Sequence, residues 1–257
     1  MDRFFVAFII DAPWPQSFPN ARLLVPHERH LTIAFLGKSN RAQTLKSFEA
    51  LSTQKLPTGF CGCFDSIIFL PEKSPRVVAY HAQTSNEDEL CEFVRNVNQH
   101  MNLVLSKQWM PHVTIGRSPF NKKEWEKSFQ PLPFCVSSFG LFESLGNLRY
   151  KVLAEIPLTP AIEKLDHTAD LAYILRGKTL EELFHHAIVS LSFDDLHFLP
   201  FLAIQRRFAS IDEIIIELNR LIRELDSQHG CPFKAVSFHD TLRKNAGFYE
   251  WEMIIDV

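Results

Sequence analysis

Two short segments of the sequence repeat the same set of groups that can exchange protons and bind a charged oxygen. The first segment is His30-Leu31-Thr32-Ile33, and the second, 82 residues later (112 minus 30), is His112-Val113-Thr114-Ile115. Side chains alternate faces along an extended strand, so each histidine shares a face with its threonine. Two such strands lining one cleft would supply imidazoles as general base and general acid, and hydroxyl groups that donate to a charged oxygen.

A single His-x-Thr segment would be weak grounds for catalysis, because any strand can carry one. The second copy, in a similar strand context, favours the catalytic interpretation. We therefore take His30, Thr32, His112 and Thr114 as the catalytic candidates.

The apolar spacing predicts the elements that must position these residues. Strands are expected at 3–10, 30–36, 60–70, 76–83, from 111 onward, at 134–143 and at 148–155, and helices at 41–52, 87–104 and 121–129. Strand, strand and helix thus occur twice, with one motif in each half. This order predicts an α+β fold made of two duplicated sheet-and-helix lobes that place the motifs opposite each other.

This part of the chain resembles the two-histidine phosphoesterases, the LigT-like RNA 2′,3′-cyclic phosphodiesterases that are also named 2′-5′ RNA ligases. The resemblance lies in residues 3–7, 30–37, 111–117 and 141–144, together with Arg149-Tyr150 and the strand after it. It extends over residues 1–157. The doubled motif makes it specific.

The resemblance implies hydrolysis of RNA 2′,3′-cyclic phosphate ends. One histidine would take a proton from water and the other would protonate the departing ribose oxygen, in either assignment. Thr32 and Thr114 would donate hydrogen bonds to the phosphate oxygens. Arg117, three residues after the second motif, could bind phosphate or lie at a strand end in water. This step needs no metal, and its reverse would be a weak 2′-5′ ligase activity.

A second domain is expected after Ile156-Pro157-Leu158-Thr159-Pro160, because two prolines within four residues mark a plausible boundary. The predicted domains are therefore 1–157 and 161–257. In the second, capping boxes at 179–182 and 210–213 open two helices, and strands are expected at 169–176, 234–242 and 249–256. This pattern predicts a small α+β layer with helices on one face of a sheet.

One polar segment of the second domain is Asp166-His167-Thr168-Ala169-Asp170. By itself, such a segment is typical of a solvated turn. Together with residues 177–182, 234–239 and 254–257, it resembles archease, the small protein that activates RtcB-type RNA ligases. The resemblance implies a divalent cation (Ca, Mg or Mn) held by Asp170, Asp256 and the terminal carboxylate of Val257, and an RtcB-type RNA ligase as partner. A stretch of roughly thirty residues usual in that family is absent before Lys234, so the domain is shortened.

Composition limits the remaining function classes. The net charge of −3 excludes a general nucleic-acid coat protein, and the five cysteines contain no CxxC pair. With no transmembrane segment expected either, we predict a reduced, cytoplasmic protein. The alternative to the enzyme is a non-catalytic accessory protein of tRNA splicing or RNA ligation that only binds RNA ends. Two intact His-x-Thr pairs favour the enzyme, because a binding protein has no need of two proton-transfer groups.

Overall fold

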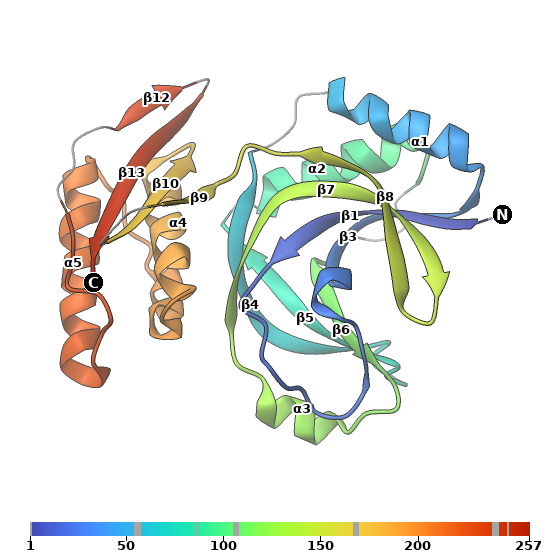
Figure 1. The fold of residues 1–257 in the computed structure, drawn as a ribbon, viewed down its shortest axis with the longest axis horizontal. Helices are drawn as coiled ribbons and strands as arrows, with labels where there is room; N and C mark the ends of the chain where they lie inside the picture. The colour runs from blue at the N-terminus through green and yellow to red at the C-terminus, as the bar shows by residue number, and fades with distance from the viewer. Residues whose placement is uncertain are drawn as a thin grey trace.

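The computed structural model describes residues 2–53, 58–85, 87–104, 108–166, 170–237, 242–245 and 247–257. These residues form two sheets with associated helices, one in the N-terminal part and one in the C-terminal part (Figure 1). Each part has its own apolar core. The predicted α+β class is confirmed.

The N-terminal sheet is antiparallel and closes on itself. Its strands are β1 (Asp2–Asp11), β2 (Arg22–Leu23), β3 (His30–Ser39), β4 (Phe60–Leu70), β5 (Val77–Thr84), β6 (His112–Arg117), β7 (Leu132–Gly146) and β8 (Arg149–Pro157). They follow the order β1-β3-β6-β5-β4-β7-β8, with β2 on β6, and β7 also pairs back with β1. The two predicted lobes thus share one continuous sheet, in which the motif strands β3 and β6 meet at the residue pair Leu31–Val113.

Helices surround the outside of this sheet (Figure 1). They are α1 (Arg41–Glu49), α2 (Glu87–His100) and α3 (Lys122–Ser128), with single turns η1 (Pro26–Glu28) and η2 (Ala50–Thr53). Helix α2 buries Leu90, Val94 and Val97, which recur at helical spacing, in the core next to β3. The apolar residues that alternate with the motif residues face the same core.

The C-terminal sheet has the order β11-β13-β10-β9, with β12 on β13. Its elements are β9 (Ile162–Leu165), β10 (Leu171–Gly177), α4 (Leu180–Ser192), η3 (Leu196–Ala203), α5 (Ile211–His229), β11 (Ala235–Val236), β12 (Arg243–Asn245) and β13 (Phe248–Asp256). Both predicted capping boxes are confirmed, because Thr179 and Ser210 accept hydrogen bonds from the amides of Glu182 and Glu213. The predicted strand at 234–242 is shorter, and residues 238–241 of it lie outside the described residues.

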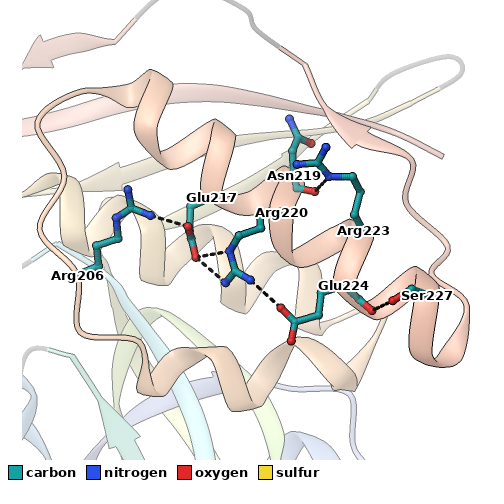
Figure 2. A network of polar contacts seen from close by, with 7 residues as sticks. All are labelled: Arg206, Glu217, Asn219, Arg220, Arg223, Glu224 and Ser227. Atoms are coloured by element: carbon teal, nitrogen blue, oxygen red, sulfur yellow. Dashed lines mark hydrogen bonds and ion pairs between the residues drawn. The ribbon is translucent and has the colours of Figure 1, made fainter.

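A buried carboxylate ties the loop after η3 to helix α5 (Figure 2). Glu217 is only 5% exposed, and its two oxygens accept from Arg206 at 2.6 Å and from Arg220 at 2.8 Å. Arg220 also pairs with Glu224 one turn later. The hydrogen bond from Arg220 lowers the pKa of Glu217, which keeps this buried group charged and paired.

The two parts meet where α4 and η3 pack over β4 and β7. A cavity of about 1180 Å³ lies between them, bordered by Cys63 and Asp65 on one side and by His185 and Phe201 on the other. Lys178 pairs with Glu89 across the same interface. Among the described residues, no helix combines the length and the apolar character needed to cross a membrane.

Candidate active site

The four predicted catalytic residues come together where β3 and β6 meet. Leu31 and Val113 pair directly and have no exposed surface, so they face the core. Because the strands are antiparallel, His30 lies next to Thr114 and Thr32 next to His112 on the opposite face, at the cross-strand spacing of roughly 5 Å. Each histidine therefore neighbours the threonine of the other copy.

A bulge follows the first motif. Thr32 pairs with Ala7 and Ala34 pairs with Val6, which leaves Ile33 without a partner on β1. A bulged residue shifts the alternation of the strand by one. Phe35 consequently returns to the motif face, where it is 74% exposed and its ring lies near the ring of Phe5.

The second motif is followed by the same bulge. Thr114 pairs with Ala79 and Gly116 with Val78, which leaves Ile115 without a partner on β5. Arg117 is thereby turned to the motif face, at the position that Phe35 occupies in the first copy. Without the bulge, the alternation of the strand would point this arginine toward the core.

Side chains and backbone from other elements bind the carbonyl groups that the bulges displace. The indole of Trp109 donates to the carbonyl of Thr32 at 2.8 Å, and the amide of Asn98 donates to that of Ile33 at 3.0 Å. In the second copy, the amide of Leu24 donates to the carbonyl of Ile115 at 2.9 Å. These bonds fix both motif strands in their irregular geometry.

Both imidazoles are held in the same way. The Nδ1 atom of His30 lies 2.7 Å from the carbonyl oxygen of Glu28, and that of His112 lies 2.8 Å from the carbonyl oxygen of Met110. A carbonyl only accepts, so Nδ1 carries the proton in each ring. The Nε2 atom of each ring is then free to exchange a proton with a substrate.

His30 lies in an aromatic enclosure. Its ring centre is 4.7 Å from that of Phe5, 5.3 Å from that of Phe142 and 5.1 Å from that of Tyr150. The pKa of His30 is lowered to about 4, mainly by burial and to a smaller extent by the nearby His112, while the hydrogen bond to Glu28 acts in the opposite direction. His30 and His112 lie on neighbouring strands, on the face opposite to the paired Leu31 and Val113.

His112 has a polar neighbour that the sequence did not reveal. His81 pairs with it across β5 and β6, and the Nδ1 atom of His81 is 2.8 Å from Oδ1 of Asp65. Burial lowers the pKa of His112, the hydrogen bond to Met110 opposes this change, and His81 adds to it.

Arg117 is exposed at the end of β6 and reaches the other half of the site. Burial raises the pKa of Tyr150, and the positive charge of the nearby Arg117 opposes this rise. Arg22 lies directly opposite Arg117 on β2. Two cations facing each other at this edge produce a positive border to the site.

The residues predicted to bind metal lie at one end of the C-terminal sheet. Asp170 precedes β10 and Asp256 ends β13, and these strands pair at Leu171–Ile255. The ammonium of Lys234 donates to the carbonyl oxygen of Val257, and Ser237 donates to Asp256 at 3.1 Å. The described residues contain no group of three or more His, Cys, Asp or Glu arranged to hold a metal ion. The cation site stays a prediction, and His167 to Ala169 lie outside the described residues.

The comparison with curated proteins identifies the family. The RNA 2′,3′-cyclic phosphodiesterase of Thermotoga maritima is 30% identical over 142 residues, which cover 49% of this chain and 73% of that protein. The chain belongs to the RNA 2′,3′-cyclic phosphodiesterase family. The resemblance read from the doubled motif is thus confirmed, whereas nothing in the comparison concerns archease. No family model matches the chain.

Solved structures that are similar to this chain match over a larger share of it. Escherichia coli LigT in its apo form has 22% identity and a TM-score of 0.48, covering 62% of this chain and 98% of that one. Escherichia coli LigT complexed with 3′-AMP has 21% identity and a TM-score of 0.45 over the same shares. A protein of Thermus thermophilus has 22% identity and a TM-score of 0.45, covering 61% of this chain and 98% of that one.

Proposed function

We propose that this protein hydrolyses 2′,3′-cyclic phosphate ends of RNA in the cytoplasm. The observation that carries the proposal is the pair of imidazoles, each with Nδ1 bound to a carbonyl two residues earlier, so that the lone pair of each ring lies on Nε2. Hydrolysis of a cyclic phosphate requires one base and one acid on opposite sides of the phosphorus. Membership of the phosphodiesterase family supports the same substrate.

The remaining residues have roles that follow from their positions. Thr32 and Thr114 lie beside the histidines and would donate to the non-bridging oxygens as negative charge increases there. Arg117 would bind the same phosphate, because its planar group matches two oxygens at once. The exposed ring of Phe35 offers a surface on which the terminal base can stack.

The proposal is tested by incubating the protein with an oligonucleotide that ends in a 2′,3′-cyclic phosphate, in EDTA, and mapping the product ends. We expect a single phosphomonoester end and no need for added metal, because the side chains supply every proton transfer. Binding of the oligonucleotide without turnover would favour the alternative, a non-catalytic accessory protein. Joining of ends through 2′-5′ linkages is expected only as a weak reverse reaction.

For the C-terminal domain we propose a divalent cation site at Asp170, Asp256 and Val257 that assists an RtcB-type RNA ligase. The support is the placement of both carboxylates at the paired ends of β10 and β13. Oxygen ligands of this kind suit Ca²⁺, Mg²⁺ or Mn²⁺. A bound cation would have to displace the ammonium of Lys234 from Val257.

Calorimetric titration of the wild type, Asp170→Ala and a Val257 deletion tests the metal site. Weaker binding in both variants is expected, and equal affinity in all three would rule the site out. The rate of guanylylation of an RtcB-type ligase, with and without this protein, tests the assistance. An unchanged rate in the presence of metal would exclude it.

A further inference from the structure

The two copies of the motif differ at one position next to the histidine. The duplication extends to the partner strands, where Val6-Ala7-Phe8-Ile9 on β1 matches Val78-Ala79-Tyr80-His81 on β5 in register with the motifs. The residue opposite His30 is Ile9, whereas the residue opposite His112 is His81. The second histidine alone has another imidazole as its cross-strand neighbour.

The strand next to His81 is distorted so that a carboxylate can reach it. Phe64 pairs with Ala82 and Ser66 pairs with His81, which leaves Asp65 without a partner on β5. A bulge of this kind redirects the side chain of the extra residue. The result is the 2.8 Å contact between Asp65 Oδ1 and His81 Nδ1, which Ser66 supports by donating to the same oxygen at 2.9 Å.

The contact fixes which atom of His81 remains available. An ionised carboxylate only accepts hydrogen bonds, so Nδ1 of His81 carries the proton and Nε2 is left for other partners. Neighbouring residues directly across an antiparallel pair point to the same face, so this edge of His81 lies on the face of His112.

The two sides of the site therefore suit different parts of the reaction. His30 is enclosed by the rings of Phe5, Phe142 and Tyr150, an environment for a ribose and base rather than for free water. His112 is bordered by the side chain of His81, which in turn contacts Asp65; the side chains of His81 and Asp65 are 31% and 34% exposed and can bind water.

We propose that His81, held by Asp65, is a positioning residue that places the attacking water at His112. This inference rests on the proposed hydrolysis of cyclic phosphates. The water oxygen forms a bond to phosphorus while the bond from phosphorus to one ribose oxygen breaks. Nε2 of His112 takes the water proton, and protonated His30 gives its Nε2 proton to the released ribose oxygen. The anionic phosphate between the rings favours the protonated form of His30 that burial disfavours in the free protein.

Partitioning between water and methanol tests this role, because a residue that holds water affects the two nucleophiles unequally. The full chain is given an oligonucleotide with a 2′,3′-cyclic phosphate in methanol–water mixtures, and the phosphate monoester and methyl ester products are counted. His81→Ile, which copies Ile9, is expected to lower kcat for hydrolysis by about 5–10-fold, the loss of one hydrogen bond between an imidazole and a water molecule. We expect KM to stay within about twofold and the ratio of methyl ester to monoester to rise at least about fivefold. Asp65→Asn keeps an acceptor for Nδ1 of His81. Its kcat and product ratio should therefore lie between those of the wild type and those of His81→Ile.

A matched control is the pair His197–Asp195 in the C-terminal part, where Nδ1 and Oδ1 are 2.7 Å apart. His197→Ile is expected to leave both kcat and the product ratio unchanged. A fall in hydrolysis by His81→Ile at an unchanged ratio, or no fall at all, would overturn the inference while the proposed function stands. A wild-type protein that opens no cyclic phosphate would overturn both.

Discussion

At the scale of single residues, the site contains two imidazoles with the same tautomer and unequal surroundings. A carbonyl two residues earlier sets each tautomer, and the aromatic rings around His30 set its low pKa of about 4. Proton transfer between substrate and protein therefore depends on Nε2 of two rings.

Replacement of either histidine should remove most of the activity. We expect His30→Ala and His112→Ala each to lower kcat about 10²–10⁴-fold on an oligonucleotide with a 2′,3′-cyclic phosphate, because each removes one proton-transfer group. Thr32→Ala and Thr114→Ala should cost about 1.5–3 kcal/mol of transition-state stabilisation. His27→Ala, at an exposed residue of η1, is the control and should leave kcat unchanged. Near-normal turnover by either motif histidine variant would contradict the two-histidine mechanism.

The pH profile of kcat/KM should be a bell that lies below pH 6.5. One ring must be neutral and the other protonated, and kcat/KM reports the pKa values of the free protein. Both are lowered, that of His30 to about 4. As pH rises above these values the protonated acid is lost, and as pH falls below them the neutral base is lost. The polar groups beside His30 are the Glu28 carbonyl and Tyr150, and those beside His112 are the Met110 carbonyl and His81. A maximum above pH 7 would show that the pKa of His30 is not lowered in the free protein.

The four motif residues of the site could be predicted from the sequence, whereas the neighbours of His112 could not. Two His-x-Thr segments are visible as letters, and strand alternation alone places His30 with Thr32 on one face. His81 and Asp65 were not recognised, because they become neighbours of His112 only through the pairing of β4, β5 and β6. The match of Val78-Ala79-Tyr80-His81 to Val6-Ala7-Phe8-Ile9 is the signal in the sequence that points to this strand.

At the scale of elements, the bulges after Thr32 and Thr114 decide which residues reach the site. The expected strands and helices were largely confirmed, since apolar alternation and helical stripes reflect which face is buried. Alternation could not show the bulges, because Ile33 and Ile115 are apolar whether they pair or not. Their carbonyl partners come from Trp109, Asn98 and Leu24, which are distant in the sequence.

The support for the first bulge can be tested at Asn98, a buried residue of α2. Its amide donates to the carbonyls of Ile33 and Val94, so Asn98→Leu leaves the carbonyl of Ile33 without this donor. We expect the free energy of unfolding in urea to fall by about 1–3 kcal/mol. Asn98→Asp should cost more, because an ionised carboxylate repels the same carbonyl. Gln99→Ala, on the exposed side of the helix, should stay within about 0.5 kcal/mol. Equal stability of Asn98→Leu and Gln99→Ala would show that the bulge needs no donor from α2.

At the scale of the whole molecule, two separate apolar cores meet at an interface in which α4 and η3 pack over β4 and β7. The core of the N-terminal part includes Phe8 and Leu158, and that of the C-terminal part includes Trp251 and Leu218. The predicted boundary after 157 coincides with the end of β8, yet Leu158 still packs in the first core and the carbonyl of Thr159 accepts from the amide of Gly59. Prolines in the sequence indicate where a strand can end. They do not show whether the residues after the strand still pack against the N-terminal core.

These contacts define the fragment that tests whether the parts fold independently. Residues 1–160 keep both motifs, the closed sheet and the attachment of Leu158, and they lose the elements that cover β4 and β7 together with the lysine that pairs with Glu89 on α2. We expect this fragment to unfold cooperatively and to hydrolyse the cyclic-phosphate oligonucleotide with a kcat/KM within about threefold of the full chain, because no residue of the site belongs to the C-terminal part. Circular dichroism during urea unfolding and the same oligonucleotide assay measure this, with the full chain as the control. A soluble fragment that lost activity would assign the C-terminal part a share in the site, and an unfolded fragment would mean that β4 and β7 depend on α4 for their stability.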